Sequence, residues 1–284
     1  MSEIKPNLIF DIGLHQGEDT EFYLEKGFEV VAFEADPVLV DQCRRKFADE
    51  IADRRLVIVE GAIVDLVHCG STSTVKFYRN ETISVWGTIF DDWAERNDSF
   101  GAQSNCIEVR AVNIADYLRL YGIPHYMKID IEGADILCLR ALLDFGLRPH
   151  YVSIESEKRE FRKLTEEFQL LERLGYSTFM AVQQANIQSQ IPPRPPLEGQ
   201  FLNRPFPPGS SGLFGHELPG KWKTRAEVLH QYRWIFILYR VFGDFGILKK
   251  SRIGRGLERA LSKLLQQPVP GWYDTHARHG EYQS

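Results

Sequence analysis

Apolar positions along the chain alternate between short continuous runs and longer stretches with helical spacing. The continuous runs, which suit buried strands, occupy residues 7–12, 28–34, 56–64, 125–131 and 150–155. Helix-like stretches separate most of these runs. This alternation indicates a mostly parallel sheet with helices on both faces, so we expect an α/β protein.

Residues that favour helix ends predict three crossover helices. The first covers about residues 18–26 and ends at Gly27, a natural C-cap residue. The second opens at Pro37, and the third covers residues 114–121 and stops at Gly122. Together with the apolar runs, these helices complete the predicted α/β pattern.

An insertion is expected at about residues 70–112. Its alternating runs at 74–78 and 106–112 predict the two strands of a hairpin. The aromatic segment between them, from Trp86 to Trp93, is interpreted either as a lid over the site or as ordinary packing of the insertion.

The texture of the chain changes in its last third. A helix over about residues 158–173 and the strand-like 176–183 come first, and then residues 188–220 become rich in Pro and Gly, which excludes a long helix. We expect an ordered or partly ordered loop there that buries Phe201, Phe206, Leu213 and Phe214. A basic helical segment follows from about Thr224.

These features predict a domain and an extension. The domain covers residues 1–187 and contains the inserted hairpin. The extension, residues 188–284, combines the Pro/Gly-rich loop with the basic helical segment and is expected to pack on the domain.

Charge is distributed unevenly along the chain. The 284 residues carry a net charge of −5, which argues against a protein dominated by nucleic-acid binding. Between residues 221 and 263, however, eleven Lys or Arg residues accompany three acids. This basic segment is a solvated helical face, a docking surface for an anionic acceptor, or a contact with a membrane surface or a protein partner.

The cysteines and the apolar runs bear on the compartment. Four cysteines, Cys43, Cys69, Cys106 and Cys138, form no C-x-x-C pair, so we expect buried free thiols in a reducing compartment. The first residues lack the apolar core of a signal peptide, and the longest apolar run, 234–239, is too short to cross a bilayer. A cytoplasmic protein without a transmembrane segment is expected.

A glycine-containing turn follows the first predicted strand. The strand ends at Asp11, Gly13 and Gly17 follow, and a helix begins, so a ligand can approach a helix N-terminus. Glu34 ends the next strand twenty-one residues after Gly13, where an acid usually binds ribose hydroxyls. Asp11 disfavours a diphosphate but suits a ligand with an ammonium and a sulfonium, as in S-adenosylmethionine.

A second charged cluster ends the strand at 125–131. Lys128, Asp130 and Glu132 alternate along it and share one face. Unpaired charges in a dry core are too costly, so we expect these residues to open into a polar cleft. The alternative is that Lys128 pairs with Asp130 or Glu132 to satisfy the strand end.

At this point the sequence resembles the FkbM-type family of S-adenosylmethionine-dependent methyltransferases. The resemblance rests on D-I-G-L-H-Q-G-E-D-T at 11–20, V-V-A-F-E-A-D-P at 30–37, G-A-I-V-D at 61–65, K-I-D-I-E-G-A-D at 128–135 and V-S-I-E at 152–155. It covers roughly residues 7–182 and implies the class I, Rossmann-like fold. The typical family turn has Asn where this chain has His15.

The resemblance implies a cofactor site. Asp11, Gly13 and Gly17 would cradle the methionine part, and Glu34 would bind the ribose. The adenine would be bordered by Ala35 and Asp36 on one side and covered by Ala62 and Ile63 on the other. The implied set also includes Leu14, His15, Asp19, Thr20 and Asp130.

Catalysis would draw on a small group of side chains. In the class I fold Asp11, Asp130 and Glu155 would line up at adjacent strand ends. The candidates for a general base are Asp130, Glu155 and His15, while Lys128 would orient an acceptor oxygen. Divalent metal is not favoured, although carboxylates at neighbouring strand ends also suit Mg²⁺.

His276 in W-Y-D-T-H-A is a further candidate for the general base. In this role the C-terminal tail would fold back and place His276 over the cleft. The alternative is an exposed surface residue, which is more common for a lone histidine in a tail.

The sequence therefore predicts an S-adenosylmethionine-dependent methyltransferase with S-adenosylhomocysteine as product. O-methylation of a small-molecule or glycan hydroxyl, or of a carboxylate, is expected, with an acceptor that can be anionic. The alternatives are an N-methyltransferase and a methyltransferase-like scaffold without activity. No nucleic-acid partner is expected, while peripheral membrane contact and a homodimer stay open.

Overall fold

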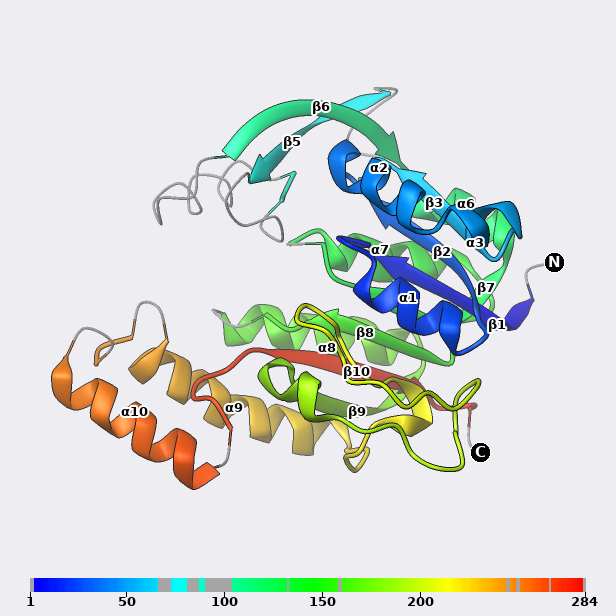
Figure 1. Ribbon diagram of the computed structural model, residues 1–284. Coiled ribbons are helices and arrows are strands. Elements are labelled where there is room, and N and C mark those ends of the chain that lie inside the picture. Colours follow the sequence, from blue (N-terminus) through cyan, green and yellow to red (C-terminus); the bar gives the residue numbers. More distant parts are fainter. Residues whose placement is uncertain are drawn as a thin grey trace. The chain divides into compact units, whose positions relative to one another are not determined.

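The computed structural model describes residues 3–65, 73–80, 87–89, 104–131, 133–157, 160–243, 246–248, 251–265 and 267–282. The chain forms two compact units (Figure 1). Unit 1 holds Met1–Val152 and Pro193–Leu202, and unit 2 holds Ser153–Pro192 and Asn203–Ser284. The boundaries of these compact units do not test the domain boundary expected at residue 187, which stays a prediction.

Unit 1 alternates strands and helices as the apolar pattern predicts. Its strands are β1 (Ile4–Ile12), β2 (Glu29–Glu34), β3 (Leu56–Glu60), β4 (Ala62–Ile63), β5 (Thr74–Asn80), β6 (Ser104–Val112) and β7 (Ile123–Ile129). Its helices are α1 (Glu18–Glu25), α2 (Pro37–Lys46), α3 (Ala48–Ala52), α6 (Ile114–Tyr121) and α7 (Asp135–Ala141), followed by the 3₁₀ turn η2 (Leu142–Asp144). Strand β8 (Tyr151–Glu155) begins in unit 1 and ends in unit 2.

The main sheet of unit 1 is parallel, with the order β3-β2-β1-β7. All seven residues of β7 are buried, which requires cover on both faces of the sheet. The α/β expectation with a mostly parallel sheet is confirmed. In this register Asp11 on β1 lies beside Lys128 on β7, so the ends of two strands far apart in sequence become neighbours.

Side-chain caps set two of the predicted helix starts. The Asn113 side chain accepts a hydrogen bond from the Ala115 N–H at the start of α6, and Gly122 ends that helix at φ 91°. The Asp36 side chain accepts from the Val38 N–H, 2.8 Å away, ahead of α2. Asp and Asn are favoured at the N-cap position, so the local sequence determines where these two helices start.

The inserted hairpin is confirmed, but one predicted strand is divided. β5 and β6 pair antiparallel, and β4 joins β6 in a separate sheet of order β4-β6-β5. The run at 56–64 is therefore two strands separated by Gly61. This position requires glycine, because its φ is 137° and a Cβ there would lie 2.5 Å from the Arg110 carbonyl oxygen. Of the proposed lid between Trp86 and Trp93, residues 87–89 are described and the rest lie outside the described residues.

The cysteine expectation is partly wrong. Cys43 and Cys138 are buried free thiols, as expected, and Cys69 lies outside the described residues. Cys106 is a free thiol but exposed, because the two-residue period of β6 puts it on the outward side with Glu108.

Unit 2 also combines strands and helices. Its elements are α8 (Phe161–Arg173), β9 (Tyr176–Gln183), the 3₁₀ turns η3 (Gln184–Ser189) and η4 (Gly215–Glu217), α9 (Arg225–Phe242), α10 (Arg252–Leu265) and β10 (Tyr273–His279). Its strands lie in the order β8-β10-β9, and β10 runs antiparallel to β9. The segment W-Y-D-T-H-A, interpreted as a tail, thus forms most of an internal strand.

The Pro/Gly-rich loop behaves as its composition predicts. Beyond η3, its described residues contain no helix longer than the 3₁₀ turn η4. Phe206, Leu213 and Phe214 are buried, while Phe201 is half-buried. The basic segment becomes α9 and α10, and Thr224 and Glu227 form a capping box at the start of α9. In the described part of the chain, no helix is long and apolar enough to span a bilayer.

Candidate functional site

The turn between β1 and α1 satisfies its own backbone. The N–H groups of Gly13 and Leu14 both donate to the carbonyl oxygen of Phe33, at 3.0 and 2.9 Å. The next three N–H groups donate to the Glu34 carboxylate, the Glu18 carboxylate and the Leu14 carbonyl oxygen, in chain order from His15 to Gly17. A phosphate would therefore meet no unsatisfied N–H group in this turn, unlike in a dinucleotide-binding turn.

Close packing explains why two turn positions are glycine. Gly13 has φ 95°, and a Cβ there would lie 2.0 Å from the carbonyl oxygen of Asp130. Gly17 has φ 79°, and its Cβ would lie 2.4 Å from the ring of Phe47. The glycines thus let β1 approach β7 and let the start of α1 approach the end of α2.

Beneath the turn lies the ammonium group of Lys128. It donates to the Gly13 carbonyl oxygen at 2.9 Å and lies 3.3 Å from the Asp11 carboxylate and 3.5 Å from that of Asp19. Asp130 is the third carboxylate, at 4.0 Å. The other oxygen of Asp11 accepts a 2.6 Å hydrogen bond from Thr20. The turn therefore encloses a cation that belongs to the protein.

Lys128 keeps its charge in this environment. Burial alone would lower its pKa, but the negative charges of Asp11 and Asp19 outweigh burial and raise the pKa well above its usual value. A permanently protonated amine cannot accept a proton, so Lys128 can orient a group but cannot act as a base. One ammonium shared by three carboxylates also leaves this end of the sheet negative.

Glu34 fixes the second half of the turn. One oxygen, Oε1, accepts from the N–H groups of Ala35 and Asp36 at 2.8 and 2.9 Å, and Oε2 accepts from His15 at 2.8 Å. A carboxylate oxygen offers two lone pairs, so Oε2 retains one for a ligand donor. Burial raises the pKa of Glu34, against the backbone hydrogen bonds, which lower it.

His15 occupies a backbone conformation that few residues tolerate. Its φ of 51° lies in the left-handed region, which Asn and His enter more readily than bulky residues. The ring Nδ1 lies 3.1 Å from Glu18. Burial alone would lower the pKa of His15, but the hydrogen bond and charge of Glu18 outweigh it and raise the pKa. The Asn-to-His difference thus preserves the turn and adds an ion pair.

Several predicted cofactor residues have structural roles. Asp36 caps α2, and Leu14 is a buried residue of the turn itself. Ala62 packs in a small cluster with Phe77 and Val109, against which Ala35 also lies. The remaining one, Ile63, is buried in β4. Their expected contacts with an adenine ring stay predictions.

The candidate bases differ in accessibility. The Asp130 side chain is 46% exposed at the end of β7, whereas Asp11 is fully buried. Glu155 ends β8 in unit 2, so its alignment with Asp11 and Asp130 stays a prediction. Glu132, which the sequence placed on the same face as Lys128, lies outside the described residues.

The alternative interpretation of His276, an exposed histidine in a tail, is wrong. His276 lies within β10 opposite Met180 and is 1% exposed. Burial lowers its pKa to about 3, which leaves a very weak base at neutral pH. The structure therefore weighs against His276 as the proton acceptor.

The pairing of the buried charges around Lys128 is the part of the site that was not predicted from the sequence. Alternation predicted that Lys128 would open into a polar cleft, with pairing to Asp130 or Glu132 as the alternative. Lys128 is instead buried, and its nearest carboxylates are those of Asp11 and Asp19, with Asp130 farther away. The available signal was the position of Asp19 and Thr20 in the first turn of α1, from which helical side chains are directed back toward the end of β1. Within the described residues, no group of three or more His, Cys, Asp or Glu is arranged to hold a metal ion.

Comparison with known families matches most of this region. A family model described as the methyltransferase FkbM domain matches residues 11–178. A curated relative, the probable ribosomal RNA small subunit methyltransferase A of Methanospirillum hungatei JF-1, is 37% identical over 62 residues, which are 22% of this chain and 24% of the relative. The chain thus matches about a quarter of that relative's length.

Solved structures also show similarity to this chain, at low sequence identity. Methyltransferase FkbM from Methylobacillus flagellatus KT superposes with a TM-score of 0.38 at 16% identity, covering 64% of this chain and 41% of that one. The precorrin-6y C5,15-methyltransferase from Geobacter metallireducens GS-15 gives a TM-score of 0.34 at 13% identity, covering 64% and 70%.

Proposed function

The chain belongs to the FkbM methyltransferase family, and from this premise we propose that it transfers a methyl group from S-adenosylmethionine to an oxygen of a small-molecule or saccharide acceptor. The observation that carries the cofactor assignment is the turn of residues 13–17. Its N–H groups are used internally, and three carboxylates surround the one ammonium of Lys128. Such a turn repels a diphosphate and suits a ligand with an ammonium and a sulfonium.

Two side chains offer contacts for the cofactor. The remaining lone pair on Oε2 of Glu34 can accept a hydrogen bond from a ribose hydroxyl. The exposed carboxylate of Asp130 can pair with the ammonium of the methionine part. Asp11 is fully buried, so it acts on the cofactor through Lys128 and Thr20 rather than by contact.

The proposed chemistry is an in-line displacement. When bound, S-adenosylmethionine supplies the methyl group on an electrophilic sulfonium. The protein has to align the acceptor with that methyl group and, for a hydroxyl acceptor, remove its proton, a contribution of roughly 10²–10⁴-fold. Asp130 is the accessible carboxylate for that step, with Glu155 and His15 as the other candidates, and Lys128 stays protonated throughout.

The acceptor atom defines the alternatives. Resemblance to the family favours oxygen, and the alternative is a nitrogen acceptor, which the same cofactor site would serve. The other alternative is a scaffold that binds the cofactor without transfer. The charges gathered around Lys128 favour an enzyme, since a scaffold has no need to keep three carboxylates around one ammonium, one of them exposed.

Calorimetric titration with S-adenosylmethionine and S-adenosylhomocysteine tests the cofactor. Glu34→Gln replaces an acceptor oxygen with an amide that clashes with a backbone N–H, so we expect affinity to fall at least about tenfold. The matched control is Glu60→Gln, because Glu60 lies beside Glu34 at the end of β3 and pairs instead with Arg44. Absence of binding to folded wild-type protein would refute the proposal.

Methyl-labelled cofactor tests the reaction. Incubation with hydroxylated and aminated acceptors should transfer label, and alkaline treatment then separates methyl esters, which hydrolyse, from methyl ethers and methylamines, which persist. Label only on nitrogen would select the alternative enzyme. Tight cofactor binding with no transfer to any acceptor class would select the scaffold.

A further inference from the structure

Exposed apolar side chains concentrate in one part of unit 2. Among the described residues, thirteen large apolar side chains are exposed, and seven of them fall between residues 234 and 272. They are Trp234, Ile237, Ile247, Leu257, Leu264, Leu265 and Trp272. Single exposed apolar residues are ordinary on a protein surface, but a concentration of this kind indicates an interaction site.

Helix α10 carries this surface with opposite chemistry on its two sides. Leu257, Leu261 and Leu264 recur at helical spacing, and Leu257 and Leu264 are 48% and 77% exposed. Arg255, Arg259 and Lys263 recur every four residues on the other side, and all three are exposed. Within the part of unit 2 that the structure describes, the apolar side of this helix faces solvent rather than another element.

Helix α9 continues the pattern. Trp234 and Ile237 lie one turn apart and are 60% and 49% exposed. Arg233 and Arg240 are exposed on the same helix. Long basic side chains beside an aromatic ring are typical of a surface that meets both apolar and anionic groups.

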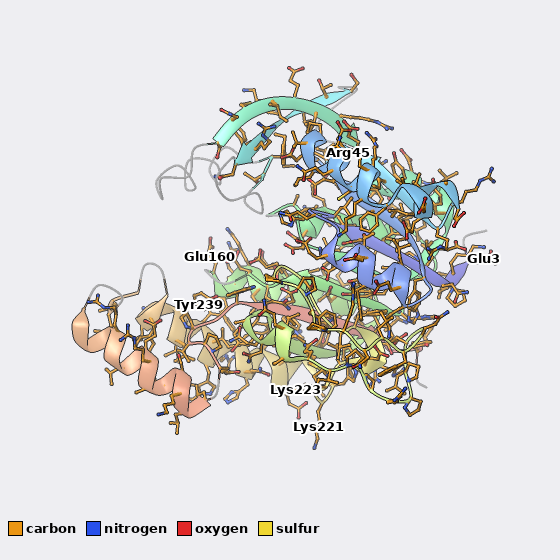
Figure 2. The ribbon with its side chains drawn as sticks, in the orientation of Figure 1. Glu3, Arg45, Glu160, Lys221, Lys223 and Tyr239 are labelled. Atoms are coloured by element: carbon orange, nitrogen blue, oxygen red, sulfur yellow. The ribbon has the colours of Figure 1, made fainter. Side chains whose placement is uncertain are left out.

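The two helices form one structural piece, the helical hairpin of residues 225–272. The N–H groups of Ile247 and Leu248 donate to the last turn of α9, at 3.2 and 3.0 Å. After α10, the Val269 N–H donates to Ser262, and Tyr239 on α9 donates to the Gly271 carbonyl oxygen. Figure 1 shows α9 and α10 together, and Figure 2 shows the side chains that project from this region.

Charge selects the partner. Eleven Lys or Arg residues between 221 and 263 against three acids make the segment strongly positive in an acidic protein. A second copy of the hairpin would bring like charges together, and a nucleic acid would leave the leucines exposed. An anionic bilayer offers both phosphate charge and an apolar layer a few ångströms below it.

We propose that the helical hairpin docks peripherally on anionic lipid bilayers, with Leu257 and Leu264 of α10 inserted among the lipid headgroups and the basic residues near the phosphates. The protein then works at a membrane surface without spanning it. Binding of this kind depends on both buried apolar area and surface charge, so each contribution can be removed separately.

Flotation of the full chain with vesicles tests the proposal. Wild-type protein should bind vesicles of phosphatidylcholine mixed with phosphatidylglycerol and should not bind vesicles of pure phosphatidylcholine. Binding should weaken between about 0.1 M and about 1 M NaCl, as the Debye length falls from ~10 to ~3 Å. Leu257→Ser with Leu264→Ser should weaken binding by at least about tenfold, and Arg259→Gln with Lys263→Gln by about fivefold for each charge.

A leucine elsewhere provides the matched control. Leu120→Ser alters a leucine of α6 that is 70% exposed, close to the 77% of Leu264, and it should leave vesicle binding unchanged. Far-UV circular dichroism and S-adenosylhomocysteine binding check that each variant folds. Wild-type protein that fails to float, or a leucine double variant that floats normally, overturns the proposal. A lipid-free dimer that the same variant dissociates would assign the surface to a second copy instead.

Discussion

In the folded chain the Lys128 ammonium lies 3.3 Å from the Asp11 carboxylate, and neither side chain has appreciable contact with solvent. The two residues are neighbours because β1 and β7 are paired with Asp11 opposite Lys128. The ammonium also holds the Gly13 carbonyl oxygen at 2.9 Å, so this ion pair links the sheet to the turn above it. The pair is therefore a positioning device for the proposed cofactor site.

Removal of one partner should be strongly destabilising. Lys128→Met leaves Asp11 and Asp19 buried without their cation, so we expect a loss of about 3–5 kcal/mol in the free energy of unfolding. Urea titration measures this loss. Lys163→Met, which removes an exposed partner of Glu160, should lose less than about 1 kcal/mol.

The double variant separates charge from packing. Asp11→Asn combined with Lys128→Met should be less destabilised than Lys128→Met alone, because fewer buried carboxylates then lack a cation. Additive losses would show that the two side chains act independently and would contradict the pairing.

Close approach of two strands predicts the effect at Gly13. An alanine there would adopt φ 95° and place its Cβ 2.0 Å from the Asp130 carbonyl oxygen. We expect Gly13→Ala to lose at least about 3 kcal/mol and to abolish cofactor binding, because the turn must move away from β7. Gly146→Ala, whose added Cβ meets no atom within 4 Å, should change stability by less than about 0.5 kcal/mol. Similar losses at both glycines would contradict a specific clash.

The ion pair of His15 predicts a pH-dependent contribution. The pKa of His15 is raised in the fold, so the stabilisation is complete below the unfolded value near 6.5 and is lost as pH rises through the folded value. His15→Asn retains the left-handed backbone but removes the charge. Urea titrations should show a loss of about 0.5 kcal/mol at pH 6 and almost none at pH 9. In protein that already carries Glu18→Gln, His15→Asn should cause no larger loss of stability at pH 6 than at pH 9. If the pH-dependent loss is still seen there, Glu18 is not the partner of His15.

Local signals explain how much of the fold the sequence could predict. The start of α2 at Pro37 and both ends of α6 follow from neighbouring residues, and the structure has them where the caps indicate. Gly13 and Gly17 were recognised in the same local way, as glycines of a tight turn between a strand and a helix, and both adopt a positive φ.

Features that depend on the pairing of strands far apart in the chain could not be predicted from the sequence. Whether Lys128 meets Asp11 or Glu132 depends on β1 lying beside β7, and 115 positions separate Lys128 from the Gly13 carbonyl that it also binds. In the same way β10 pairs with β9 across about ninety intervening residues, and its first five residues are all buried, so it lacks the alternation that marks a half-exposed strand.

Burial of His276 in that strand predicts acid sensitivity. Its pKa falls to about 3 in the fold, whereas an unfolded histidine titrates near 6.5. Between these values the unfolded chain binds a proton that the folded chain does not, so stability should fall with decreasing pH by about 1.4 kcal/mol per unit from this group. Urea titrations at several values below pH 6.5 should therefore give a shallower slope of unfolding free energy against pH for His276→Asn than for wild type. Equal slopes for wild type and His276→Asn would mean that the buried ring is protonated in the fold, and would reopen its candidacy as a base.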